Sequence, residues 1–91
     1  MKRNHLEIMI EILSICKERA NMSRIVYSAN LNFTNVKPYI EFLLREGMLR
    51  MIDGPMVKYE ITPKGAEAFE DLRKIQDELI QPLRGMIEAA C

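Results

Sequence analysis

The few side chains of catalytic types in this sequence lie too far apart to form a recognisable site. The single histidine, His5, and the two cysteines, Cys16 and Cys91, match no zinc spacing, no redox motif and no pair of nucleophile and base. The sequence also contains no glycine-rich phosphate-binding loop. We therefore predict that the protein is not an enzyme and needs neither a cofactor nor a metal. Cys16 lies on an apolar stripe and is expected to be a small buried hydrophobic residue.

A second group of side chains has the chemistry needed to contact duplex DNA. Asparagine can pair with adenine through two hydrogen bonds, lysine can reach guanine, and small polar or cationic side chains bind phosphates. The predicted DNA-contacting residues are Arg24, Ser28, Asn32, Thr34, Asn35, Lys37, Tyr39, Arg50 and Lys58. A solvated surface without a ligand is the alternative at these positions, because the charges of residues 33–46 cancel.

The elements that position these side chains can be predicted from the spacing of the apolar residues. Residues 4–17 should form a helix, because apolar residues recur there at helical spacing and Asn4 can cap its start. Residues 18–22 are a polar connection. Ser23 is then expected to cap a short second helix, with the ring of Tyr27 turned inward and its hydroxyl turned outward.

A third helix follows the Asn-Leu-Asn sequence at residues 30–32, which is typical of a tight turn. Its start has two alternatives. If Asn35 is the cap, Pro38 lies harmlessly in the first turn; if Asn32 is the cap, Pro38 removes one helical hydrogen bond and bends the helix. Gly47 is expected to end this helix in a left-handed conformation. The buried face should consist of Phe33, Val36, Ile40, Leu43 and Leu44.

After this helix the apolar period changes from 3.6 to 2, which indicates strands. Residues 49–52 and 57–61 alternate in polarity, and Asp53-Gly54-Pro55 between them is a turn sequence. We therefore predict a β-hairpin that carries Arg50 and Lys58 on its outer face. Two short helices joined by a tight turn and followed by a hairpin make a helix-turn-helix with a wing.

The last helix is expected to begin at Thr62-Pro63, a cap followed by proline at the first helical position, and to run to about Gln81. Pro82 and Gly85 should interrupt it. Apolar residues in this helix are spaced alternately by three and four positions, as on one side of a coiled coil. We predict that this a/d seam holds a homodimer together, through Phe69, Leu72, Gln76, Leu79, Leu83 and Met86. The alternative is an amphipathic helix that packs only against its own subunit.

The predicted fold is thus mainly α with a small β-hairpin, an α+β winged helix-turn-helix at residues 1–62 and a C-terminal dimerisation helix at residues 63–91. The formal net charge is zero, but its distribution is uneven. Residues 1–65 carry ten Lys and Arg against seven Asp and Glu, whereas residues 66–91 carry three against six. Phosphate contacts should therefore lie within residues 1–65. With no membrane span and no signal peptide in the sequence, we expect a cytoplasmic, nucleoid-associated protein.

Three segments carry a resemblance to a known family: residues 25–33, residues 39–49 and residues 59–65, the last of which is Tyr-Glu-Ile-Thr-Pro-Lys-Gly. They resemble the small archaeal winged-helix proteins, which include ten-kilodalton chromatin-associated proteins and predicted transcriptional regulators. The resemblance implies a dimer held by an antiparallel coiled coil of C-terminal helices, with double-stranded DNA bound by the winged-helix heads. Pro38 and Pro82 depart from the uninterrupted helices of that family. The competing function is a winged helix that contacts another protein instead of DNA.

Overall fold

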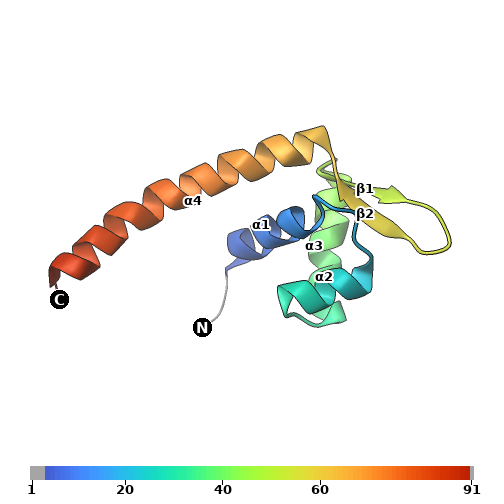
Figure 1. Cartoon of the computed structure of the whole chain (residues 1–91), viewed down its shortest axis with the longest axis horizontal. Helices are drawn as coiled ribbons and strands as arrows, with labels where there is room; N and C mark the ends of the chain where they lie inside the picture. Colours follow the sequence, from blue (N-terminus) through green and yellow to red (C-terminus); the bar gives the residue numbers. More distant parts are fainter. Residues whose placement is uncertain (1–3, 91) are drawn as a thin grey trace.

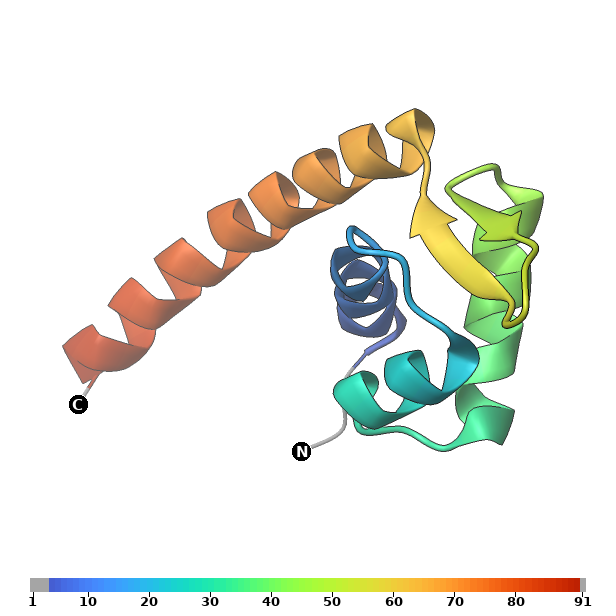
Figure 2. The same ribbon diagram turned by 45° about the vertical axis from the view of Figure 1, so that its right-hand side comes forward.

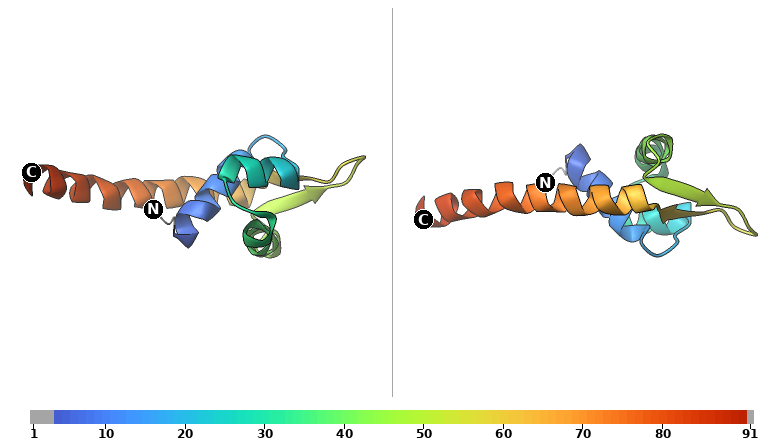
Figure 3. Two further views of the ribbon diagram at one scale, coloured as in Figure 1. Left: turned by 90° about the horizontal axis from the view of Figure 1, so that it is seen from below. Right: turned by 90° about the horizontal axis from the view of Figure 1, so that it is seen from above.

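The computed structural model describes residues 4–90, and the side chains of residues 4–78. Within that range the chain is mainly helical with one small hairpin, as predicted. The elements in order are α1 (His5–Ile15), α2 (Met22–Ala29), α3 (Phe33–Arg45), β1 (Leu49–Ile52), β2 (Lys58–Ile61) and α4 (Pro63–Ala90). The first three helices and the hairpin form a head, and α4 extends from the hairpin past α1 (Figures 1 and 3).

The first two helices both begin at asparagine caps. The Asn4 side chain accepts a hydrogen bond from the Glu7 backbone N–H at 2.7 Å, as the sequence predicts. At α2 the prediction of Ser23 as the cap is wrong. The cap is Asn21, which has an extended backbone and accepts from the Arg24 N–H at 2.8 Å. Asparagine caps a helix at least as well as serine, so the helix takes in two more residues at its start.

The start of α3 is the earlier of the two alternatives. Asn32 caps the helix and accepts from the Asn35 N–H at 2.8 Å, so Pro38 lies inside the helix. Proline has no N–H, and the carbonyl of Thr34 therefore loses the helical hydrogen bond that residue 38 would have donated. The helix ends as predicted at Gly47, which has a φ of +74°.

The hairpin is antiparallel, and its register divides the side chains between two faces. Leu49 pairs with Ile61, and Met51 pairs with Tyr59, on the face turned toward α3. Figure 2 shows the hairpin beside α3. The connection before α2 also joins this sheet, because Ala20 exchanges both backbone hydrogen bonds with Tyr59 at 2.8 and 3.0 Å. This third, one-residue strand was not anticipated from the sequence.

The core lies between α1, α2, α3 and the first turns of α4. Its buried side chains are Ile8, Ile10, Ile12, Leu13, Cys16, Ala20, Ile25, Val36, Ile40, Leu43, Leu49 and Phe69. Cys16 is fully buried, as predicted, and burial raises the pKa of its thiol to about 12. Tyr27 contradicts its prediction, because its side chain is 87% exposed on the outside of α2.

The start of α4 is tied to the end of α3. Thr62 caps the helix by accepting from the Gly65 N–H at 3.0 Å, and its hydroxyl donates to the carbonyl of Gly47. A side chain at Gly65 would collide with the carbonyl oxygen of Met48, 2.0 Å from the position of its Cβ, so only glycine permits this approach.

The rest of α4 corrects two predictions. The helix does not end near Gln81, because it continues through Pro82 and Gly85 to Ala90. A single proline removes one helical hydrogen bond, which the surrounding turns of this helix tolerate. Phe69 is only 1% exposed and packs in the core of its own subunit, so it is not available to a partner. Leu72 and Gln76 are half-buried, whereas the side chains of Leu79, Leu83 and Met86 lie outside the described residues. The division at residues 62 and 63 stays a prediction.

Candidate nucleic-acid interface

One side of α3 is free of packing and carries two of the predicted contacts, Thr34 and Lys37. Val36, Ile40 and Leu43 are buried against the head, which leaves the opposite side of the helix to solvent. We call this side the outer face of α3. Its exposed side chains are Thr34, Lys37, Glu41 and Arg45. Asn35 is exposed beside them, on the flank that turns toward α1.

The N-terminal end of α3 offers backbone hydrogen-bond donors. Asn32 uses its side-chain oxygen to cap the Asn35 N–H, so the structure gives Asn32 a role in the helix start. The N–H groups of Phe33 and Thr34 have no partner among the described residues. Free N–H groups at a helix start, together with the helix dipole, attract anions such as phosphate.

The second helix carries two of the predicted residues. Arg24 and Ser28 are both exposed on α2. The Arg24 guanidinium lies 3.8 Å from the Glu18 carboxylate, and both side chains are largely exposed. An exposed ion pair at this distance contributes little to stability, so the Arg24 guanidinium remains available to another anion.

Tyr39 does not lie on the outer face of α3. Its ring is half-buried in the groove between α1 and α3, and its hydroxyl is hydrogen-bonded to Nδ1 of His5 at 2.5 Å. The two rings are tilted by 41°, with centroids 5.8 Å apart. Tyr39 directly precedes the buried Ile40, so helix periodicity places its side chain at the edge of the buried face. This edge lies on the side of α3 that faces α1. The structure thus gives Tyr39 a contact that joins two helices.

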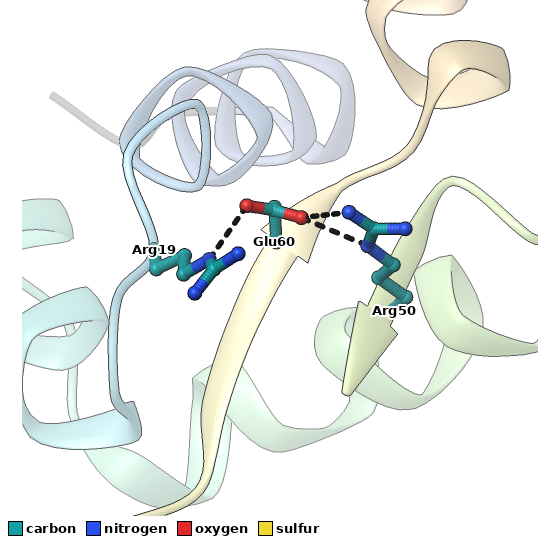
Figure 4. Close-up of polar contacts among 3 residues, drawn as sticks. All are labelled: Arg19, Arg50 and Glu60. Atoms are coloured by element: carbon teal, nitrogen blue, oxygen red, sulfur yellow. Dashed lines mark hydrogen bonds and ion pairs between the residues drawn. The ribbon is translucent and has the colours of Figure 1, made fainter. Parts of the chain in front are cut away.

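Arg50 is the second predicted contact that the structure places in an intramolecular network. Figure 4 shows Glu60 between Arg50 and Arg19, which comes from the connection before α2. Nε of Arg19 donates to one carboxylate oxygen at 2.8 Å, and Arg50 donates to the other through Nε at 2.8 Å and through a second guanidinium nitrogen. These hydrogen bonds hold the pKa of Glu60 below its ordinary value.

Two cationic side chains lie on the hairpin face that is turned away from α3. Arg50 is hydrogen-bonded to Glu60, whereas Lys58 has no partner among the described residues. Arg50 and Glu60 form a cross-strand pair, and Lys58 pairs with Ile52 on the same face. Lys58 is exposed and forms no ion pair with any described residue.

Neither a metal centre nor a membrane span is found in the part of the chain that the structure describes. That part brings no three potential metal ligands together. It also contains no helix that combines the length and the apolar character of a transmembrane segment.

A family model described as winged helix-turn-helix matches residues 2–79 of this sequence. The chain belongs to the winged helix-turn-helix family. An uncharacterized protein of Methanocaldococcus jannaschii, MJ0287, is 35% identical over 75 residues, which are 81% of this chain and 74% of the relative. Another protein of that organism, MJ0290, is 33% identical over 76 residues, but this match spans only 35% of the relative's length.

Two solved structures from Sulfolobus solfataricus are similar to the chain. Sso10a-2, described as a DNA-binding protein, has a TM-score of 0.76 and 28% identity, and the match covers 96% of both chains. The transcriptional regulator BldR has a TM-score of 0.69 and 19% identity, and the match covers 92% of this chain and 72% of that one. At 19% identity, the similarity to BldR shows the fold alone. The predicted family resemblance is confirmed, and the chain has the fold of winged-helix regulators.

In the winged-helix fold, α3 occupies the position called the recognition helix and the hairpin the position called the wing. Three exposed residues near them, Tyr27, Phe33 and Arg45, were not among the predicted contacts. A helical projection would have found Arg45, which follows Thr34 and Glu41 at intervals of seven and four residues along the outer face. Phe33 was assigned to the buried face, but it is the first residue of α3 and lies beyond the edge of the core.

Proposed function

We propose that this protein binds double-stranded DNA as a homodimer, with the recognition helix in the major groove and the wing on the sugar–phosphate backbone. It acts as a transcriptional regulator or as a chromatin-associated protein. No reaction is part of this function. The similarity to Sso10a-2 over 96% of both chains supports the assignment, together with the family's helix-turn-helix.

The observation that carries the proposal is the composition of the N-terminal half of α3. Thr34, Asn35 and Lys37 are exposed there, next to the two unpaired N–H groups of the first turn. Asparagine and lysine are suited to adenine and guanine edges, and the free N–H groups to phosphate. Arg24 and Ser28 on α2, and Lys58 on the wing, are available for phosphates on either side.

Homodimerisation is proposed from the free length of α4. A helix of 28 residues is about 42 Å long, far longer than the part that packs on α1. Ile75 is 49% exposed and lies next to the half-buried Leu72 and Gln76. An isolated helix is marginal in water, so an apolar stripe on an unsupported helix favours pairing with a second copy.

Binding of labelled duplexes at increasing salt concentration tests the DNA-binding proposal. Affinity measured by fluorescence anisotropy should fall linearly on a log–log scale, with a slope of about −0.9 for each phosphate neutralised. Lys37→Ala should weaken binding, whereas Lys74→Ala removes the same charge from α4 and should leave affinity unchanged. The absence of duplex binding at the lowest salt concentration would contradict the proposal.

The same assay separates the two kinds of DNA-binding protein. In a sequence-specific regulator Asn35→Ala should lower the affinity for the preferred duplex by roughly 1–3 kcal/mol and leave the others unchanged. In a chromatin component Asn35→Ala should matter little, and Lys37→Ala should lower all affinities together. The second candidate function, a protein-binding winged helix, is favoured by the cancelling charges of residues 33–46. It would be supported if wild type bound no duplex at low salt concentration.

A further inference from the structure

Two aromatic side chains are exposed beside the N-terminal end of the recognition helix. Tyr27 on α2 is 87% exposed, and Phe33, the first residue of α3, is 54% exposed. Together with Val26 and Leu31 they line a shallow hollow of about 750 Å³ between the two helices. We call Tyr27 and Phe33 the aromatic pair.

The aromatic pair has no evident role in the stability of the head. The side chains that form the core lie on the other sides of both helices, and the Tyr27 hydroxyl has no hydrogen-bond partner among the described residues. Burying an aromatic side chain is strongly favourable, so two rings left in water at one place indicate a surface that is covered by a ligand.

Cationic groups border the aromatic pair. Arg24 lies one turn before Tyr27 on α2, and Lys37 lies one turn after Phe33 on α3, so both are neighbours on their helix surfaces. The unpaired N–H groups of Phe33 and Thr34 are at the same end of α3. The occupant of this surface should therefore present apolar groups between anionic groups.

The major groove of duplex DNA presents such a surface where it contains thymine. The C5 methyl group of thymine projects into the groove between the two phosphate backbones, and apolar side chains such as phenylalanine contact it. In a helix-turn-helix the first residues of the second helix are the ones that reach base edges. Phe33 holds that position here.

We propose that the aromatic pair contacts thymine methyl groups in the major groove and gives the protein a preference for A·T base pairs. This inference rests on the proposed function. It explains how the recognition helix selects its site although the charges of residues 33–46 cancel, because methyl contacts need no charge. Phe33 makes the apolar contact at the helix start, and Tyr27 extends the apolar surface toward the neighbouring base pair.

The test replaces thymidine by deoxyuridine, which removes the methyl groups and leaves the Watson–Crick pairing intact. Affinities are measured at fixed salt for a 24-base-pair alternating A·T duplex and for the same duplex with deoxyuridine throughout. The wild-type protein should bind the thymidine duplex about fourfold more tightly for each methyl group it buries. Phe33→Ala should bring this ratio close to one, and Tyr27→Ala should reduce it.

Phe42→Ala is the matched control. Phe42 is on the same helix and is 42% exposed, but it lines the groove toward α1, so its removal should leave the ratio unchanged. A second pair of duplexes adds the methyl group instead of removing it. An alternating G·C duplex with 5-methylcytosine carries a methyl group at the same edge, and wild type should bind it more tightly than the unmethylated duplex, whereas Phe33→Ala should not.

The outcomes separate this inference from the proposed function. Equal binding of both A·T duplexes by wild type overturns the methyl contact, although DNA binding itself stands. An unchanged ratio in Phe33→Ala also overturns it and leaves the two rings as a surface for protein contact. If wild type binds no duplex at any salt concentration, the proposed function fails and the methyl contact fails with it.

Discussion

Glu60 joins three segments of the head through its two carboxylate oxygens. Arg50 belongs to the neighbouring strand, whereas Arg19 comes from the connection between α1 and α2 (Figure 4). The lowered pKa of Glu60 means that the folded state favours its ionised form. The network therefore fixes the base of the wing and also reduces the positive charge that Arg50 offers to other anions.

Replacement of Glu60 tests this role through the dependence of stability on pH. The contribution of Glu60 to the free energy of unfolding is fully present above the ordinary pKa of a glutamate. It is lost as the pH falls through the lowered pKa of the folded state. Glu60→Gln should therefore lower the urea midpoint at neutral pH and weaken its fall on acidification. Glu67→Gln removes an exposed carboxylate that has no ion pair among the described residues, and it should change neither. An acid profile of Glu60→Gln identical to that of wild type would contradict this role.

Cys16 should be unreactive toward thiol reagents in the folded protein. Its side chain is fully buried, and at pH 8 a pKa of about 12 leaves roughly a thousandfold less thiolate than an exposed cysteine has. In a Cys91→Ser background, Ellman's reagent should react slowly in native buffer and at once in denaturing urea. Rapid reaction of the native variant would show that Cys16 is accessible.

At the scale of elements, the recognition helix and the wing divide the proposed work between base contacts and phosphate contacts. Proline inside α3 leaves the Thr34 carbonyl without a helical partner, at the end of the helix proposed to enter the groove. The wing carries Lys58 free and Arg50 engaged with Glu60. The two basic residues of the hairpin are therefore expected to differ in their contribution to binding.

Alanine substitutions in the wing test this difference. Lys58→Ala should weaken binding to all duplexes by a similar factor and reduce the salt slope by about 0.9, as expected of one lost phosphate contact. Arg50→Ala should have a smaller effect, because Glu60 already neutralises part of its charge. The affinities are measured at several salt concentrations. A changed sequence preference with an unaltered slope would assign Lys58 to base contact instead.

At the scale of the whole molecule, the described contacts between α4 and the head involve α1, β2 and the end of α3. Phe69 is buried and attaches α4 to the core. The ammonium nitrogen of Lys17 lies 4.0 Å from the centre of the Phe69 ring. The molecule measures 54 × 26 × 19 Å, and α4 and the hairpin reach opposite ends of the long dimension (Figure 1). In the proposed dimer, the partner's helix covers the part of α4 that its own head leaves uncovered.

A charged substitution at Ile75 tests the dimer without touching the core. Ile75 is half-exposed in the subunit, so Ile75→Asp should keep the fold while placing a charge against the partner helix. Light scattering at micromolar concentration should give about twice the 10.6 kDa chain mass for wild type and the chain mass for Ile75→Asp. Lys74→Asp, one residue away on the side opposite the seam, should remain dimeric. A wild-type protein that is monomeric under these conditions would contradict the dimer.

The sequence by itself determined the elements and most of their ends. The Asn4 and Thr62 caps, the Gly47 helix end and the hairpin turn all follow from interactions between residues a few positions apart. Such interactions depend on local backbone geometry. The apolar period, 3.6 in a helix and 2 in a strand, identifies which element a segment forms. The fold class and the family resemblance could therefore be predicted before any tertiary contact was known.

Only the tertiary structure decided which side chains remain free. Phe69 fits an a/d seam in the sequence, yet it is buried in the core of its own subunit. Tyr39 and Arg50 are polar residues on predicted surfaces, but partners 34 and 10 residues away engage them. Phe33 was expected on the buried face from the apolar spacing and the ring of Tyr27 from its aromatic character, but the packing of α2 on α3 leaves both exposed. Burial depends on neighbours distant in the sequence, so the spacing of apolar residues along one helix cannot specify it.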